Sequence, residues 1–110
     1  MRFLKLASNL LGRSPEAPFT WPYWIDVSVD GPQAQVAFAE GVAHGSAGGV
    51  FTLEEALSPQ WRTHFERAEG EWLLPYLERL AGGGVVTETE LRAAFTERHG
   101  REPEHYDWDR

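Results

Sequence analysis

The sequence predicts a single α+β domain, in which a small antiparallel sheet of two or three strands packs against three or four helices, with an additional N-terminal helix. The first observation is the length of 110 residues, which is that of one domain. The second is an alternation of apolar and polar residues between positions 23 and 38, the pattern of half-buried strands. The third is a change to helical spacing from residue 53 onward.

The first segment, residues 1–12 ("MRFLKLASNLLG"), has the pattern of an amphipathic helix that packs on the domain. Its apolar residues would share one wide face: Phe3, Leu4, Leu6, Ala7, Leu10 and Leu11. A signal peptide fits less well, because Lys5 interrupts the apolar run and no small-x-small cleavage site follows. Two basic residues would give little attraction to a membrane surface.

Residues 13–22 contain three prolines and predict a loop, and residues 23–52 predict a β-hairpin region. In "YWIDVSVDG", Tyr23, Ile25, Val27 and Val29 would face one way, and Trp24, Asp26, Ser28 and Asp30 the other. After the turn "DGPQ", a second strand would place Ala34, Val36 and Phe38 on one face. The stretch "GGVFTL" is a candidate third strand, and the helices are expected to cover the apolar face.

Residues 53–100 form the predicted helical region. Capping boxes are expected at Thr52 with Glu55 and at Thr87 with Glu90, and Ser58 is expected to cap a helix with Pro59 in its first turn. An apolar stripe runs from residue 61 to residue 80, but Pro75 cannot take an ordinary interior position. Either one helix kinks there or two helices meet; the pattern favours two, near 59–69 and 71–81.

The last helix should end at Gly100, and Glu88 and Arg92 are spaced as a stabilising i,i+4 pair. Residues 101–110 form an acidic, aromatic tail, which either folds back on the domain or serves as a linear motif; folding back is favoured.

Composition and charge exclude some classes of function and disfavour others. The chain has no cysteine, which excludes disulfides, thiolate nucleophiles and Cys-ligated zinc and fits a reducing cytoplasm. High usage of Ala, Gly, Arg and Glu suggests a bacterial origin. The net charge of −7 repels phosphate backbones and anionic lipid, and favours basic partners or simple solubility. No apolar run approaches the length of a membrane span.

Motifs for catalysis or metal binding are not found in the sequence. No two of the histidines (His44, His64, His99 and His105) have the spacing of helical metal ligands, and no serine lies in a nucleophile elbow. We therefore assign no catalytic residue, cofactor or metal ligand, and the sequence argues against an enzyme. A helix-turn-helix nucleic-acid binder is disfavoured, because residues 81–87 make too long a turn and Glu88 and Glu90 would face the groove.

The leading functional hypothesis is a non-catalytic protein–protein interaction module whose partner is another protein, with a basic one matching its charge best; a homo-oligomer stays open. Candidate partner-binding residues are the aromatics next to acids: Trp24, Asp26, Tyr106 and Trp108. Trp24 is either exposed or covered by the N-terminal segments. The alternative hypothesis is a small-ligand binder or small enzyme that uses the Gly-rich loop 44–49, although this loop lacks the lysine of a P-loop.

Overall fold

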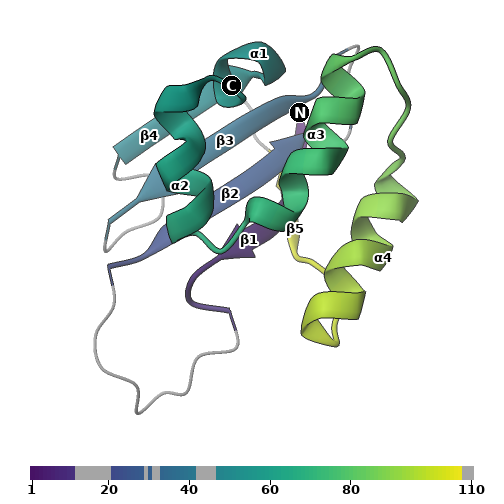
Figure 1. Ribbon diagram of the computed structural model, residues 1–110. Helices are drawn as coiled ribbons and strands as arrows, with labels where there is room; N and C mark the ends of the chain where they lie inside the picture. The colour runs from purple at the N-terminus through teal and green to yellow at the C-terminus, as the bar shows by residue number, and fades with distance from the viewer. Residues whose placement is uncertain (12–20, 29, 31–32, 42–46, 108–110) are drawn as a thin grey trace.

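A five-stranded antiparallel sheet forms the centre of the structure, and its helices pack on one face (Figure 1). The structure, a computed structural model, describes residues 1–11, 21–28, 30, 33–41 and 47–107. The strands lie side by side in the order β4-β3-β2-β1-β5. Their bounds are Arg2–Ser8 for β1, Tyr23–Ser28 for β2, Gln35–Glu40 for β3, Ala47–Thr52 for β4 and His105–Asp107 for β5.

The N-terminal segment is a strand, so the predicted helix over residues 1–12 is wrong. β1 pairs antiparallel with β2 on one side and with β5 on the other. Its apolar residues, Phe3, Leu4, Leu6 and Ala7, are all buried. When the side chains on both faces of a strand are buried, its sequence is a nearly continuous apolar run. Over this short length, such a run cannot be distinguished from a helix by periodicity.

The predicted sheet of two or three strands is also wrong, because β1 and β5 extend it to five. β5 lies in the segment expected as a tail, and it pairs Arg2 with Asp107 and Phe3 with Tyr106. The described part of the tail therefore folds back onto the domain. At the other end of the sheet, β4 occupies the stretch proposed as a third strand and pairs with β3, with Phe51 opposite Val36.

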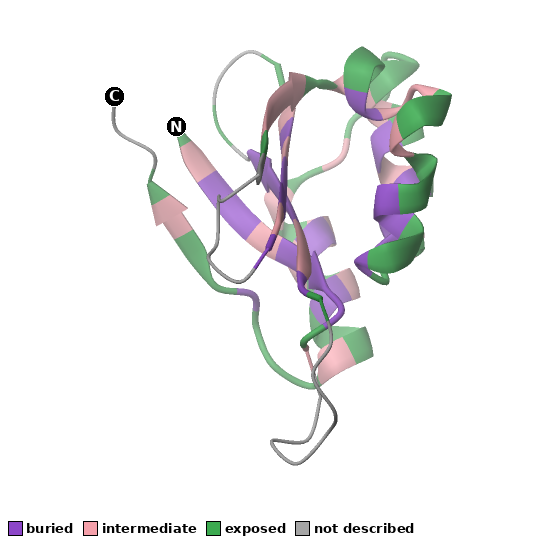
Figure 2. Cartoon of the chain, turned by 90° about the vertical axis from the view of Figure 1, so that its left-hand side faces the viewer, coloured by how far each residue is buried: buried purple, intermediate pink, exposed green. Residues whose placement is uncertain are grey.

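One face of the sheet forms the hydrophobic core together with the helices (Figure 2). Ile25 lies opposite Phe38 and Val27 opposite Val36, so the alternation seen in the sequence brings these four side chains together. All four are buried in one cluster with Leu4 of β1 and apolar residues of the helices. The cluster also includes Phe65, Ala68, Leu73, Leu77, Leu91 and Phe95.

The helical region contains α1 (Leu53–Ala56), α2 (Arg62–Arg67), α3 (Leu74–Ala81) and α4 (Glu88–His99). Two short 3₁₀ segments, η1 (Pro59–Trp61) and η2 (Glu71–Leu73), lead into α2 and α3. The chain thus forms two helical units across Gly70, as the position of Pro75 indicates. A Cβ atom at Gly70 would lie 2.8 Å from Cδ1 of Ile25 and 2.9 Å from Cβ of Ala7. Glycine at this position therefore allows the chain to pass close to the sheet.

The predicted helix ends are largely confirmed. Both capping boxes form, and Gly100 ends α4 in the left-handed conformation with φ 71°. The Glu88–Arg92 pair forms with 2.7 Å between Oε2 and Nε. Ser58 differs from the prediction: it precedes η1 without capping it, because its hydroxyl donates instead to the carbonyl oxygen of Glu55 at 2.7 Å.

Candidate functional site

The sheet face opposite the core, called the rear face below, carries three of the four residues that the sequence indicated as partner-binding. No described helix packs on this face (Figure 1). Trp24 and Asp26 alternate along β2 with the core residue Ile25, and Tyr106 of β5 lies opposite Phe3 of β1. The fourth residue, Trp108, lies outside the described residues.

Asp26 and Tyr106 are in direct contact on the rear face. The Tyr106 hydroxyl donates to Oδ2 of Asp26 at 2.6 Å, and Asp26 is only 1% exposed. The Tyr106 ring stacks on Phe3 with 5.6 Å between centroids, and the Lys5 ammonium lies 5.6 Å from the ring centre. Burial, and then the hydrogen bond to Asp26, raise the pKa of the Tyr106 hydroxyl well above its usual range. The phenol is therefore a permanent donor at neutral pH, and this cluster holds β5 on the sheet.

Among the described tryptophans, the exposed one is Trp21 rather than Trp24. Trp24 is half-buried, whereas Trp21 is 46% exposed and Leu10 is 41% exposed. The Asn9 side chain fixes this region, since its amide donates to the Trp21 carbonyl and its oxygen accepts from the Tyr23 amide, each at 2.9 Å. The sequence reasoning missed Trp21 because it weighed side-chain alternation within the strand and not the residues just before it.

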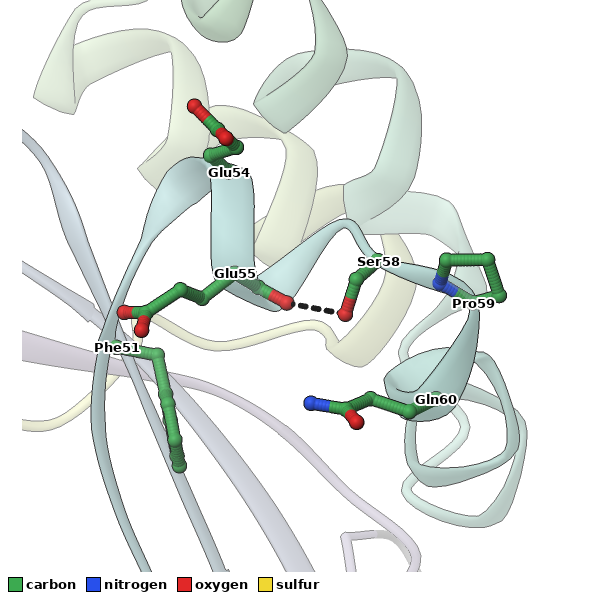
Figure 3. Close-up of a pocket in the computed structure, with 6 residues that line it drawn as sticks. All are labelled: Phe51, Glu54, Glu55, Ser58, Pro59 and Gln60. Carbon is green, nitrogen blue, oxygen red and sulfur yellow. Dashed lines mark hydrogen bonds between the residues drawn. The ribbon is translucent and has the colours of Figure 1, made fainter.

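The edge of the sheet formed by β4 lies beside an acidic hollow (Figure 3). Among the described residues, no strand pairs with the outer side of β4. The hollow is open and has a volume of about 560 Å³. It is lined by Phe51, Glu54, Glu55, Ser58, Pro59 and Gln60. In Figure 3 the Gln60 side chain extends toward Phe51, the Glu55 carboxylate turns toward the strand beside Phe51, and Glu54 points away from the other lining residues.

Local sequence explains how this hollow is built. β4 runs directly into α1, and the capping box at that junction fixes Glu55, whose Oε1 accepts from the Thr52 amide at 2.9 Å. Glu54 is exposed in the same first turn. Phe51 supplies the apolar wall, and its ring lies 4.7 Å from that of Trp61. The result is two carboxylates next to an aromatic surface at the end of an edge strand.

A second, smaller cavity of about 140 Å³ lies where the chain after α4 approaches β1. Its lining includes the cations Lys5 and Arg101 and the acid Glu104. The volume is below the roughly 300–1,000 Å³ of typical ligand pockets. We therefore do not treat this cavity as a candidate site.

His64 is a buried side chain of the core and not part of either candidate surface. Its Nε2 donates to the Trp24 carbonyl at 3.1 Å, and its ring packs edge-on against Phe38 with centroids 4.7 Å apart. Desolvation is the main reason why the pKa of His64 is lowered from 6.5. His64 thus favours its neutral form in the folded protein.

The lowered pKa of His64 predicts a loss of stability on mild acidification. Below pH 6.5 the unfolded chain binds a proton at this position that the folded chain resists, so the free energy of unfolding falls as pH drops from 6.5 toward the lowered pKa. Urea unfolding at pH 7, 6 and 5 measures this slope, and His64→Gln should flatten it. His99→Gln is the control that measures the contribution of His99, the other described histidine whose pKa is lowered, mainly by burial. An unchanged slope in His64→Gln would contradict the assignment.

The other hypotheses from the sequence concern the Gly-rich loop, metal binding, nucleic-acid binding and membrane spans. Residues 44–46 of the Gly-rich loop lie outside the described residues, so the structure does not place His44. Within the described ranges, no group of three or more His, Cys, Asp or Glu residues could hold a metal ion. At the start of α4, Glu88 pairs with Arg2 and Arg92, and Glu90 pairs with Arg79. Among the described helices, none combines the length and the apolar composition of a membrane span.

Comparison with protein-family models, with curated proteins and with solved structures finds no match for this chain. The function is therefore inferred from the geometry and charge of the two surfaces described above.

Proposed function

We propose that the protein is a non-catalytic interaction module that binds another protein through a positively charged region of that partner. The observation that carries this proposal is the acidic hollow beside the β4 edge. It combines an aromatic wall, two carboxylates and a strand with no described neighbour on its outer side. Protein interfaces commonly combine aromatic contacts with complementary charge, and the hollow supplies an aromatic surface and negative charge for a basic partner.

The distribution of charge supports a basic partner. Between Arg13 and Arg62 the sequence contains no lysine or arginine, and all of β2, β3, β4 and α1 lie within this stretch. The same stretch contains six acidic residues: Glu16, Asp26, Asp30, Glu40, Glu54 and Glu55. Together with the net charge of −7, this composition attracts cationic surfaces and repels anionic ones.

Affinity capture from cells of the source organism, combined with cross-linking and mass spectrometry, tests the proposal. At an ionic strength of about 0.15 M we expect a stoichiometric partner, with cross-links to a basic segment and weaker capture as salt is raised. Size-exclusion chromatography with light scattering on the purified protein measures self-association in parallel. A strictly monomeric protein that captures no partner at this salt concentration would overturn the proposal.

A further inference from the structure

We infer that the partner binds as an extended segment that adds a sixth strand along β4, and that this segment carries lysine or arginine. This inference rests on the proposed function and specifies its mode of binding. In strand addition, main-chain hydrogen bonds supply affinity, and pockets for alternate side chains supply specificity.

The described residues of β4 include none of those by which an edge strand is commonly protected. Such edges commonly carry lysine or proline, or are very short. β4 is six residues long, with the uncharged sequence "AGGVFT". By comparison, the opposite edge strand β5 has three residues and includes His105 and Asp107. β4 is therefore the edge on which another strand can add.

The two glycines of β4 leave its main chain uncovered, and only one of them is required by the fold. At Gly48, with φ 124°, a Cβ would lie 2.0 Å from the Phe38 carbonyl oxygen, so packing against β3 demands glycine. At Gly49 a Cβ would lie 3.6 Å from the Phe51 ring, which is an ordinary contact. The absence of a side chain at Gly49 is thus not imposed by packing, and it keeps the space beside Phe51 open.

The hollow defines the side chain that the added strand would carry. Phe51 offers an apolar surface for an aliphatic stem, and Glu54 and Glu55, which also line the hollow, give it the negative charge that attracts a cationic end. Lysine and arginine combine these two parts, because their methylene stems pack on apolar surface while the charged group stays in water. A neutral or acidic side chain would gain no charge pairing there.

The same charges argue against a second copy of this chain as the occupant. Antiparallel pairing of two β4 strands would bring the end of one strand, next to Glu54 and Glu55, toward the start of the other. That start lies opposite Glu40 of β3. Each end of the joined strands would then gather acidic side chains of both copies with no cation from β4, and like charges near an interface disfavour the complex.

The test uses the full chain and a ten-residue peptide that alternates lysine and valine, with a glutamate–valine peptide as the charge control. Fluorescence anisotropy measures affinity, and hydrogen exchange measures protection of residues 47–52. We expect the lysine peptide to bind and to protect these amides, and the glutamate peptide not to bind. Glu54→Gln should weaken binding about two- to fivefold, as expected for an exposed ion pair. Glu97→Gln, at an exposed glutamate of α4, should leave binding unchanged.

Two N-methylated versions of the peptide separate strand addition from simple charge attraction. Because amides alternate in direction along a strand, methylating one alternate set should weaken binding at least about tenfold, and methylating the other set should not. Equal binding of both methylated peptides and the parent would overturn strand addition. Protection of β4 by self-association without peptide would overturn the basic segment as occupant. If the cellular partner binds but the lysine peptide does not, this inference fails and the proposed function stands.

Discussion

Phe38→Ala is expected to lower the free energy of unfolding by about 3–5 kcal/mol, the usual cost of removing a fully buried aromatic side chain. Phe38 is 2% exposed and lies where the sheet meets the first helical unit. Its ring stacks on Trp61 with centroids 4.4 Å apart and contacts the rings of Phe65 and His64 at 5.4 and 4.7 Å. Truncation to alanine would leave a cavity among residues from several elements, which cannot all move to fill it.

Urea unfolding followed by tryptophan fluorescence and circular dichroism measures this effect. Because domains of this size have a total stability of about 5–15 kcal/mol, Phe38→Leu serves as a milder variant that should fold and show a smaller loss. Phe51→Ala is the matched control, since the Phe51 ring belongs to the same aromatic group but is only partly buried. Equal losses for Phe38→Ala and Phe51→Ala would contradict the central position given to Phe38.

Tyr106→Phe is expected to lower the free energy of unfolding by about 1–3 kcal/mol, because it removes a hydrogen bond from a buried carboxyl group while keeping the stacked ring. The hydroxyl of Tyr106 donates to Asp26 at 2.6 Å, so the substitution removes a link between β5 and β2. Hydrogen exchange should show faster opening of residues 105–107. Tyr23→Phe is the control, because the Tyr23 hydroxyl accepts an exposed hydrogen bond from Arg67 and its loss should cost little.

Because the pKa of Tyr106 is raised, the free energy of unfolding should also depend on pH in the alkaline range. Above pH 10.0, the ordinary value, the unfolded chain loses the phenolic proton while the folded chain keeps it. Stability should therefore fall as pH rises beyond 10.0, and Tyr106→Phe should make this fall shallower. Urea unfolding at pH 9, 10 and 11 measures it. An identical alkaline slope in wild type and Tyr106→Phe would exclude the buried hydrogen bond as its cause.

Much of the helical half of the fold could be predicted from the sequence because its signals are local. Capping residues such as Thr52 and Thr87 act on their own first turn, and Pro75 fits only the first turn of a helix, where α3 places it. The hairpin of β2 and β3 could be predicted for a similar reason, since alternation reports a strand with one face in the core.

The two strands that extend the sheet beyond β2, namely β1 and β5, could not be predicted, because they depend on pairing between distant segments. Phe3 and Leu4 belong to a strand only because β2 and β5 flank it, and nothing within residues 1–12 indicates either neighbour. β5 has three residues, too few to show a periodicity. The sequence located Trp24, Asp26 and Tyr106 as unusual, but only the pairing of β1 with both neighbours brings Asp26 and Tyr106 together.

The pairing of β1 with β5 also has a consequence for synthesis on the ribosome. β1 is made first among the described elements and β5 last, so nearly the whole domain must emerge between them. At translation rates of about 5–20 residues per second, several seconds pass between the synthesis of β1 and that of β5. During that time nascent chains expose the flank of β1 that β5 later covers.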